Sequence, residues 1–567
     1  MNGASGNRHS RQMQELFLRT ISSRPGIADI LFACMSLLFS LAALKGTLQL
    51  SPLGAGIDTD LQNYAQILEA ARYPAAFAAD PIARLFVHDP GVPNLMTDLA
   101  GLFSSSANAA VAILKAGAIA IWLHLLSWYA LGRFLGIRAS LAVLLSLACS
   151  ITFYWAYGTY WGATQAEPIP RVFFNSCLAL FLGLALPALK SYGIRLLLAA
   201  LLGASVFVHS VSALMAGAMF LTSFLLLPCQ KDGARFNFIR HLFQTLGCTL
   251  LYLVPVACFL LWRVPVAQPT GEDMALFEQV FALRYSNNWQ DVWGSLFAVL
   301  AQYTYKIPLF PLGLIALVLL FCKRHLLPRR MQELPKLLLV LVLGMAAGCI
   351  VCFLEMQLAA SLGRQSMSQE MLRGTRFLVP LCLLSFACVV SIAWRKLPGL
   401  VASCAVVAGT LALFSLSQDR QVMAARYYLA SVCHLDAEDG ALREQERNRL
   451  EVDAMQAIVR LVPQNEIIFA PEDTMAVRYI ARHPLHAVHK DGNAIYYSRN
   501  PAVARQWLHE QSRLAASPDS VIPVWIETDA KWLLVRKSGR FWTALNQDMT
   551  GFPVVYDNAD WQLLRKP

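Results

Sequence analysis

The stretch IADILFACMSLLFSLAAL, residues Ile27–Leu44, is apolar apart from Asp29 and two serines. A helix of about 20 such residues can cross the hydrocarbon core of a membrane. The whole chain of 567 residues is 56% hydrophobic and only 15% charged, and its mean hydropathy is +0.48. This composition excludes a soluble enzyme and predicts a membrane protein with many spans.

Basic residues precede the first apolar run at Arg8, Arg11, Arg19 and Arg24. A signal peptide has the same order of basic and apolar segments, but this leader is long and shows no small-residue cleavage site. We therefore expect the first run to be retained as a signal anchor, with residues 1–26 as a cytoplasmic N-terminal segment.

Further apolar runs predict additional spans. They cover residues 109–131, 139–157, 172–189, 194–208, 211–228, 242–262, 307–322, 337–355, 377–394 and 398–416. About eleven transmembrane helices place the two termini on opposite sides of the membrane. Lys and Arg are concentrated in the loops that are cytoplasmic if the N-terminus lies inside, so we expect an N-in/C-out topology. The net charge of +11 then indicates contact with anionic lipid headgroups and not with nucleic acid.

The chain divides into a transmembrane domain at 27–417, with a large outer loop at 46–108, and a tail at 418–567. The tail alternates helical and strand patterns, which predicts a small α/β domain outside the membrane. Helices are expected at 451–461, 474–482 and 501–514, and strands at 466–470, 486–489, 532–535, 554–556 and 561–564. The expected fold class is a polytopic α-helical membrane protein with a C-terminal extracytoplasmic α/β domain.

The cysteines do not predict a disulfide-built outer domain. Of the 13 cysteines, only Cys433 lies in the tail, and a lone cysteine cannot form an internal disulfide. Cys349 and Cys352 form a CxxC inside an apolar run, where packing between helices is a better interpretation than redox chemistry.

Two carboxylates follow the first span in the stretch GIDTDLQNYA, residues 56–65. Leu61–Ala71 has apolar and polar residues at helical spacing, which predicts an amphipathic helix along the membrane interface. Asp60 can simply cap the start of this helix. Alternatively, Asp60 or Asp58 faces a cavity as a general base or as a ligand of a divalent metal.

The stretch from Asp60 to Ala65 resembles a signature of the C-type glycosyltransferase superfamily. These polytopic membrane enzymes use polyprenyl-phosphate-linked sugars, and many carry Asp-Glu-x-x-Tyr-Ala in their first outer loop. Asp60, Tyr64 and Ala65 match the Asp, Tyr and Ala of that signature, while Leu61 replaces its second acid. The resemblance implies sugar transfer from a polyprenyl-phosphate donor at the outer face of a membrane, here a bacterial inner membrane.

Transfer from a lipid phosphate needs a base for the incoming hydroxyl or amine and cations for the departing phosphate. The candidate acids are Asp60 and Asp58, with Asp80 or Glu167 as a second acid, and the resemblance leaves room for Mg²⁺ or Mn²⁺. The candidate groups for the phosphate or the donor are Arg284, Arg373, Arg376 and His209. The candidate aromatic platform for a sugar is Tyr64, Tyr285 and Trp289.

Each candidate also has a structural interpretation. Arg373 and Arg376 can reach lipid headgroups at a membrane boundary, and Arg284 can belong to an interfacial aromatic belt. Glu167 can pair with Arg171, and His209 can be a hydrogen-bonded packing residue.

Three other functions remain open from the sequence. A transporter or lipid-linked-glycan flippase is one, although its spans usually carry ionisable residues that are rare here. A polysaccharide polymerase or ligase is another. The third is a non-catalytic membrane scaffold whose tail binds glycans. For the glycosyltransferase, the acceptor can be a lipid, a glycan or a protein.

Overall fold

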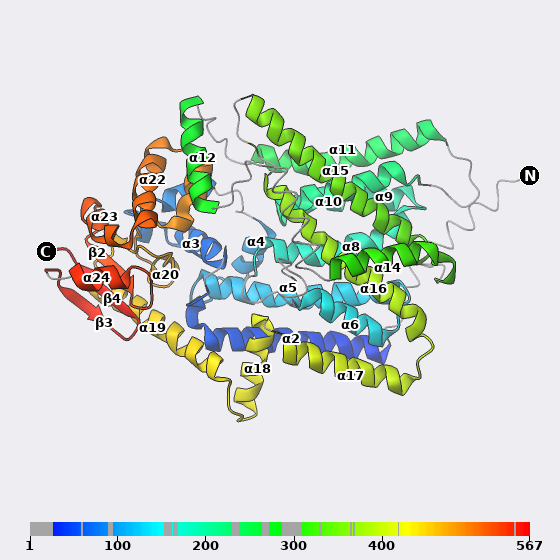
Figure 1. Ribbon diagram of the computed structural model, residues 1–567, viewed down its shortest axis with the longest axis horizontal. Coiled ribbons are helices and arrows are strands. Elements are labelled where there is room, and N and C mark those ends of the chain that lie inside the picture. The colour runs from blue at the N-terminus through cyan, green and yellow to red at the C-terminus, as the bar shows by residue number, and fades with distance from the viewer. Residues whose placement is uncertain are drawn as a thin grey trace, which may run out of the picture.

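Figure 1 shows the computed structural model of the chain. The structure describes residues 26–57, 60–88, 94–151, 162, 168–229, 237–262, 271–285, 309–327, 331–362, 366, 369–417, 419–548 and 551–567. Apolar helices form a bundle on one side of the molecule, and a sheet with its helices forms a separate layer at the other end (Figure 1).

Seven helices of the described residues are long and apolar enough to cross a membrane. They are α2 (Ile27–Leu50), α5 (Ala109–Phe134), α8 (Pro170–Ala188), α11 (Phe238–Trp262), α15 (Leu334–Ser361), α16 (Leu378–Trp394) and α17 (Gly399–Leu416). Four shorter apolar helices lie among them: α6 (Ala139–Ser150), α9 (Tyr192–Ala204), α10 (Ser210–Leu226) and α14 (Leu309–Cys322).

Each predicted span overlaps one of these apolar helices, although residues 152–157 and 307–308 of two predicted spans lie outside the described residues. The chain is therefore a polytopic helical membrane protein, as its composition predicted. The crossing of the membrane by the four shorter helices, and the N-in/C-out orientation, stay predictions.

Arg195 shows how the bundle satisfies a buried charge. This side chain is fully buried in α9, and its guanidinium donates to the carbonyls of Ala188, Phe224 and Leu227 at 3.2, 3.2 and 2.8 Å. These carbonyls lie at the C-terminal ends of α8 and α10, where backbone oxygens lack helical partners and the helix dipole is negative. Arg195 therefore ties two helix ends together.

The segment after α2 contains the 3-10 helix η1 (Pro52–Gly54), helix α3 (Asp60–Arg72), the 3-10 helices η2 (Pro74–Phe77) and η3 (Ala83–His88), and α4 (Leu95–Gly101). Helix α3 packs between α5 and the C-terminal helices, and most of its residues are buried. The expected position along a lipid interface is therefore wrong, because protein covers several faces of this helix.

The C-terminal region, residues 419–567, contains a four-stranded sheet in the order β1-β2-β4-β3. Strand β1 (Ile468–Phe469) pairs in parallel with β2 (Trp532–Arg536), while β4 (Trp561–Arg565) is antiparallel to β2 and to β3 (Val554–Asp557). The helices are α18 (Arg420–Val432), α19 (Asp439–Leu461), α20 (Ala476–Tyr479), α21 (Gly492–Ser498), α22 (Pro501–Ala516), α23 (Val521–Glu527) and α24 (Trp542–Asp548), with the 3-10 helices η9 (His489–Asp491) and η10 (Pro518–Ser520).

The predicted strand at 486–489 is wrong. Only Leu485 pairs there, through a single parallel bridge to Ile468. The chain then turns, because the Asp491 carboxylate accepts a hydrogen bond from the Val488 N–H at 3.0 Å and η9 begins at His489. A side chain therefore satisfies a backbone group that a strand would have paired.

Helix α12 (Gly271–Tyr285) comes from the membrane part of the chain but packs against α21 and α22 of the C-terminal region. The C-terminal region thus contacts both the segment after α2 and a segment between two apolar helices, and Figure 1 shows these elements at one end of the bundle.

Candidate functional site

The turn between α2 and α3 brings the chain sharply out of the first apolar helix. Leu53, Gly54 and Gly56 have φ angles of 57°, 78° and 69°. Gly56 has no room for a side chain, because an added Cβ would overlap the amide oxygen of Asn448. Position 56 therefore requires glycine both for its backbone angle and for the close approach of Asn448 on α19.

The C-terminal region holds this turn through side chains that are distant in sequence. The Asn448 amide donates to the Leu50 carbonyl at 2.8 Å and to the Ser51 Oγ at 3.1 Å. The Glu451 carboxylate accepts from the Gly56 N–H at 3.0 Å, and the Tyr479 hydroxyl donates to the Gly54 carbonyl at 3.1 Å. The exit of the first apolar helix is thus fixed by α19 and α20.

Glu451 is an unusual partner because it is almost fully buried. Burial raises the pKa of Glu451 to about 7, although Arg536 and the Gly56 N–H act in the opposite direction. The carboxylate that holds the turn therefore titrates near neutral pH.

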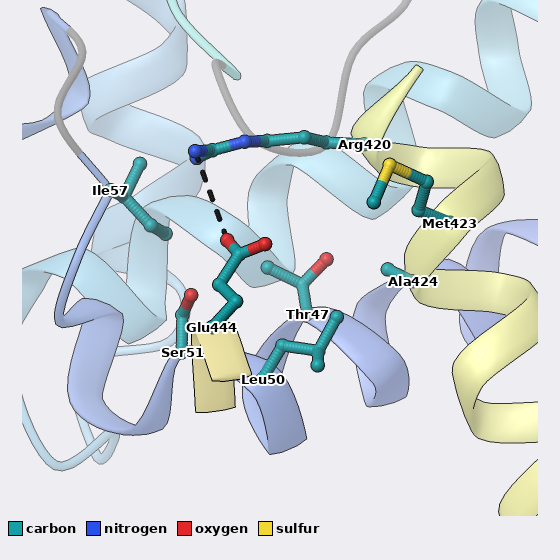
Figure 2. Close-up of a pocket in the computed structure, with 8 residues that line it drawn as sticks. All are labelled: Thr47, Leu50, Ser51, Ile57, Arg420, Met423, Ala424 and Glu444. Atoms are coloured by element: carbon teal, nitrogen blue, oxygen red, sulfur yellow. Dashed lines mark ion pairs between the residues drawn. The ribbon is translucent and has the colours of Figure 1, made fainter. Parts of the chain in front are cut away.

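A small cavity lies beside the turn (Figure 2). Its lining includes Ile57, Thr47 and Leu50 from the α2 side and Arg420 and Glu444 from α18 and α19. Figure 2 shows the Arg420 guanidinium reaching toward the Glu444 carboxylate, at a distance of 3.8 Å. With a volume of about 20 Å³ the cavity holds about one water molecule, so it is too small for a sugar.

Asp60 begins α3 and forms an ion pair with Arg171 at the start of α8. The Arg171 Nη2 lies 3.2 Å from the Asp60 Oδ2. The Asp60 side chain is 39% exposed, whereas that of Arg171 is 13% exposed. A largely buried cation thus faces a carboxylate that solvent can still reach.

The same junction includes the segment that carries Arg376. One turn after Arg171, the Phe174 ring stacks on Phe377, with ring centroids 5.6 Å apart. Phe377 ends the 3-10 helix η8 (Gln369–Phe377), and Arg376 directly precedes it. The starts of α3 and α8 and the end of η8 therefore bring Asp60, Arg171 and Arg376 to one region of the molecule.

Asp80 is placed differently, in a fully buried ion network with Arg478. The Arg478 guanidinium donates to Asp80 at 2.7 Å, to Asp491 at 2.9 Å and to the Gln66 amide oxygen at 2.7 Å. Burial raises the pKa of Asp491 above its usual value. Burial alone would lower the pKa of Arg478, but the carboxylates of Asp491 and Asp80 raise it above its usual value. Asp80 joins the first loop to the C-terminal region.

The other described candidates lie in separate places. Arg284 is in the last turn of α12 beside Gly492, whose added Cβ would lie 3.2 Å from the Arg284 Cβ. His209 caps α10, since its Nδ1 accepts from the Ser212 N–H at 3.3 Å. Tyr64, one turn after Asp60, is partly buried against the main core.

Several predicted residues lie outside the part of the chain that the structure describes: Asp58, Glu167 and Trp289, and the side chains of Tyr285 and Arg373. Within the described residues, no three His, Cys, Asp or Glu side chains come together as a metal site requires. The predicted Mg²⁺ or Mn²⁺ therefore stays a prediction.

A larger cavity, of about 790 Å³, lies between the first loop and the edge of the sheet. Its walls come mainly from Ala, Pro and Phe side chains of α3, η2 and η3, with Ile467 and Asp529 from the C-terminal region. Arg84 is the basic residue of its lining, and the mainly apolar walls suit an apolar group better than a charged one.

Sequence reasoning missed the parts played by Arg171, Arg478, Asn448 and Glu451. Arg171 carried one usable signal, since it is a basic residue on the side where few are expected. The other three lie in helical stretches of ordinary polarity. No local pattern marks their partners Leu50, Gly56 and Asp80, which are hundreds of positions away.

No protein-family model matches the chain, and no curated protein matches it. Among solved structures, the chain is similar to ArnT from Cupriavidus metallidurans bound to undecaprenyl phosphate. That likeness covers 94% of this chain and 97% of the other, with 14% sequence identity and a TM-score of 0.47.

Proposed function

We propose that the protein is a C-type glycosyltransferase that moves a sugar from a polyprenyl-phosphate donor to a lipid, glycan or protein acceptor at the outer face of the membrane. Two features support this function. Asp60–Ala65 resembles the signature of that superfamily, and Asp60 forms an ion pair with Arg171 at the junction of the bundle and the C-terminal region. This pair supplies an acid that solvent can reach and a cation beside it.

In the proposed reaction, Asp60 accepts the proton of an acceptor hydroxyl or amine. The acceptor atom forms a bond to the anomeric carbon of the sugar while the bond from that carbon to the phosphate oxygen breaks. The phosphate leaves with the electron pair, and a nearby guanidinium stabilises its added charge.

Arg171 is the first choice for that guanidinium, because it already contacts Asp60. A guanidinium has five N–H donors in a fixed plane and can bind a carboxylate and a phosphate together. Arg376 is the second choice because of its position at the end of η8. Arg284 is not assigned to the phosphate, because it lies where α12 packs on the C-terminal region.

The test uses the full chain reconstituted in lipid nanodiscs with radiolabelled polyprenyl-phosphate sugars and candidate acceptors. We expect Asp60→Asn to lower sugar transfer by about 100-fold or more, since a general base contributes about 10²–10⁴ in rate. Arg171→Gln is expected to weaken binding of polyprenyl phosphate, measured by native mass spectrometry. EDTA followed by Mg²⁺ or Mn²⁺ tests the metal in the same assay.

Asp98→Asn is the matched control, because Asp98 is an exposed carboxylate of the same loop. It should leave transfer unchanged. The proposal fails if the wild-type protein neither binds nor turns over any polyprenyl-phosphate sugar, or if Asp60→Asn behaves like Asp98→Asn. Movement of the donor lipid across a vesicle membrane without sugar transfer would instead support the flippase alternative.

A further inference from the structure

Helix α18 differs in direction from the apolar helix that precedes it. It follows α17 after residues 417–419. In Figure 1, α18 (yellow) runs across the direction of α2 and α17 and extends sideways from the bundle. A helix that leaves the end of a span in this direction lies along the plane of the membrane.

The contacts between α18 and α2 indicate how deep α18 lies in the membrane. Ala425 packs on Ala42 and Ala43, and the Ala424 carbonyl occupies the space that a side chain at Gly46 would fill. About 20 residues of helix cross the hydrocarbon core, so a core that begins near Ile27 ends near Gly46. Helix α18 therefore crosses α2 at the level of the membrane surface.

The end of α18 presents apolar side chains to the surroundings. Leu429, Val432 and Leu435 are 52%, 56% and 66% exposed. The helix ends because His434 adopts a left-handed conformation, with φ of 52°, and the Leu435 N–H donates to the Ala430 carbonyl at 2.9 Å. This helix-ending motif turns the chain back and keeps Leu435 beside the last turn.

Polar contacts close the hairpin of α18 and α19 behind this tip. The Arg426 Nη2 lies 3.4 Å from the Glu438 Oε1, and the Tyr427 hydroxyl donates to the Gln445 amide oxygen at 3.0 Å. The Arg426 guanidinium also donates to the Phe414 carbonyl, at the end of α17, at 3.2 Å. The hairpin is thus tied to the last span, while its apolar tip is left uncovered by the described residues.

We propose that the hairpin tip, defined as Leu429, Val432 and Leu435, inserts into the lipid surface on the side of the C-terminal region. The apolar surface of α17 continues toward it, since Leu411 and Leu416 are 62% and 66% exposed. An apolar face at headgroup depth, with tyrosines and arginines beside it, is the composition of an interfacial helix. The tip thereby holds the C-terminal region close to the membrane.

The experiment uses Cys433, an exposed cysteine within the tip. The full chain in lipid nanodiscs is labelled with a polarity-sensitive NBD dye, and the signal of an identically treated Cys433→Ala protein is subtracted. We expect blue-shifted emission, strong quenching by lipids with a nitroxide near the headgroup, and weak quenching by aqueous iodide. Replacing Leu429, Val432 and Leu435 together by serine should reverse all three results.

The control is Ile526→Cys in the Cys433→Ala background, because Ile526 is 54% exposed but lies on α23 in the sheet layer. Its dye should report water. Water-like emission and full iodide quenching at Cys433 would overturn the proposal. Blue-shifted emission without quenching by the nitroxide lipids would overturn it in favour of a protein partner or a second copy. The measurement involves no sugar transfer, so it stands or fails separately from the proposed activity.

Discussion

The side chain of Glu451 connects two parts of the chain that the sequence separates widely. Glu451 lies in α19. It accepts a hydrogen bond from the Gly56 N–H, which belongs to the turn after the first apolar helix. A buried carboxylate near neutral pKa is costly when charged, because burial disfavours the ion. The free-energy cost of ionising Glu451 in this buried position should lower the stability of the folded protein.

We expect Glu451→Gln to stabilise the protein at pH 8 but not at pH 4.5. The pKa of Glu451 is about 7 in the folded protein and near its ordinary value of 4.5 when unfolded. The folded state therefore binds more protons between these values, and stability falls as the pH rises from 4.5 to 7. Gln keeps an acceptor for the Gly56 N–H and carries no charge, so the gain at pH 8 is at most about 3 kcal/mol.

The measurement is thermal unfolding of both proteins across pH 4.5–8.5 in the same detergent. Glu472, whose pKa burial also raises to about 7, is present in both proteins and cancels in the difference. A stability difference that does not change with pH would show that Glu451 does not titrate in this range.

At the scale of elements, the Arg478 network determines how the first loop meets the C-terminal region. Arg478 comes from α20, Gln66 from α3, Asp80 from the segment between η2 and η3, and Asp491 from the end of η9. Four elements from widely separated parts of the chain are thus joined by one guanidinium.

Replacing Arg478 by Met is expected to lower the free energy of unfolding by about 3–5 kcal/mol, because two buried carboxylates lose their cation. Limited proteolysis should then cut the first loop faster. Arg505→Met is the matched control, since Arg505 is 67% exposed and pairs with Asp273 at 3.2 Å. An exposed pair contributes at most about 1 kcal/mol. Equal losses for the two variants would contradict a special role for Arg478.

For the whole molecule, the orientation in the membrane decides on which side the candidate site works. Among the described residues, seven helices are long and apolar enough to span the membrane, and the four shorter ones make eleven. Either number is odd, so the prediction that all of them cross puts the termini on opposite sides. The distribution of Lys and Arg predicts that the C-terminal region lies outside.

A membrane-impermeant maleimide tests this orientation in intact cells. We expect Asp519→Cys, an exposed position in η10, to be labelled without permeabilisation. Lys323→Cys, an exposed position at the end of α14, should be labelled only after permeabilisation. Background from native cysteines is measured on the unsubstituted chain. Labelling in the reverse order would refute the N-in/C-out prediction and with it the outer-face activity.

The apolar helices were predictable because their signal is local. A run such as Ile27–Leu44 is too long and too apolar to remain in water, whatever surrounds it. The helix at 501–514 and the strands at 532–535 and 561–564 were predictable for a similar reason, since each carries its own periodicity. The strand predicted at 486–489 is absent, because the side chain of Asp491 satisfies the backbone there.

The sequence by itself determined that this is a polytopic membrane protein, and it identified Asp60 as the start of a helix after the first span. Only the tertiary structure decided that Arg171 faces Asp60, that Arg478 takes Asp80 into a buried network, and that Glu451 holds Gly56. The physical reason is distance along the chain. Burial of an apolar run depends on its own composition, whereas an ion pair depends on which remote elements the fold brings within about 3 Å.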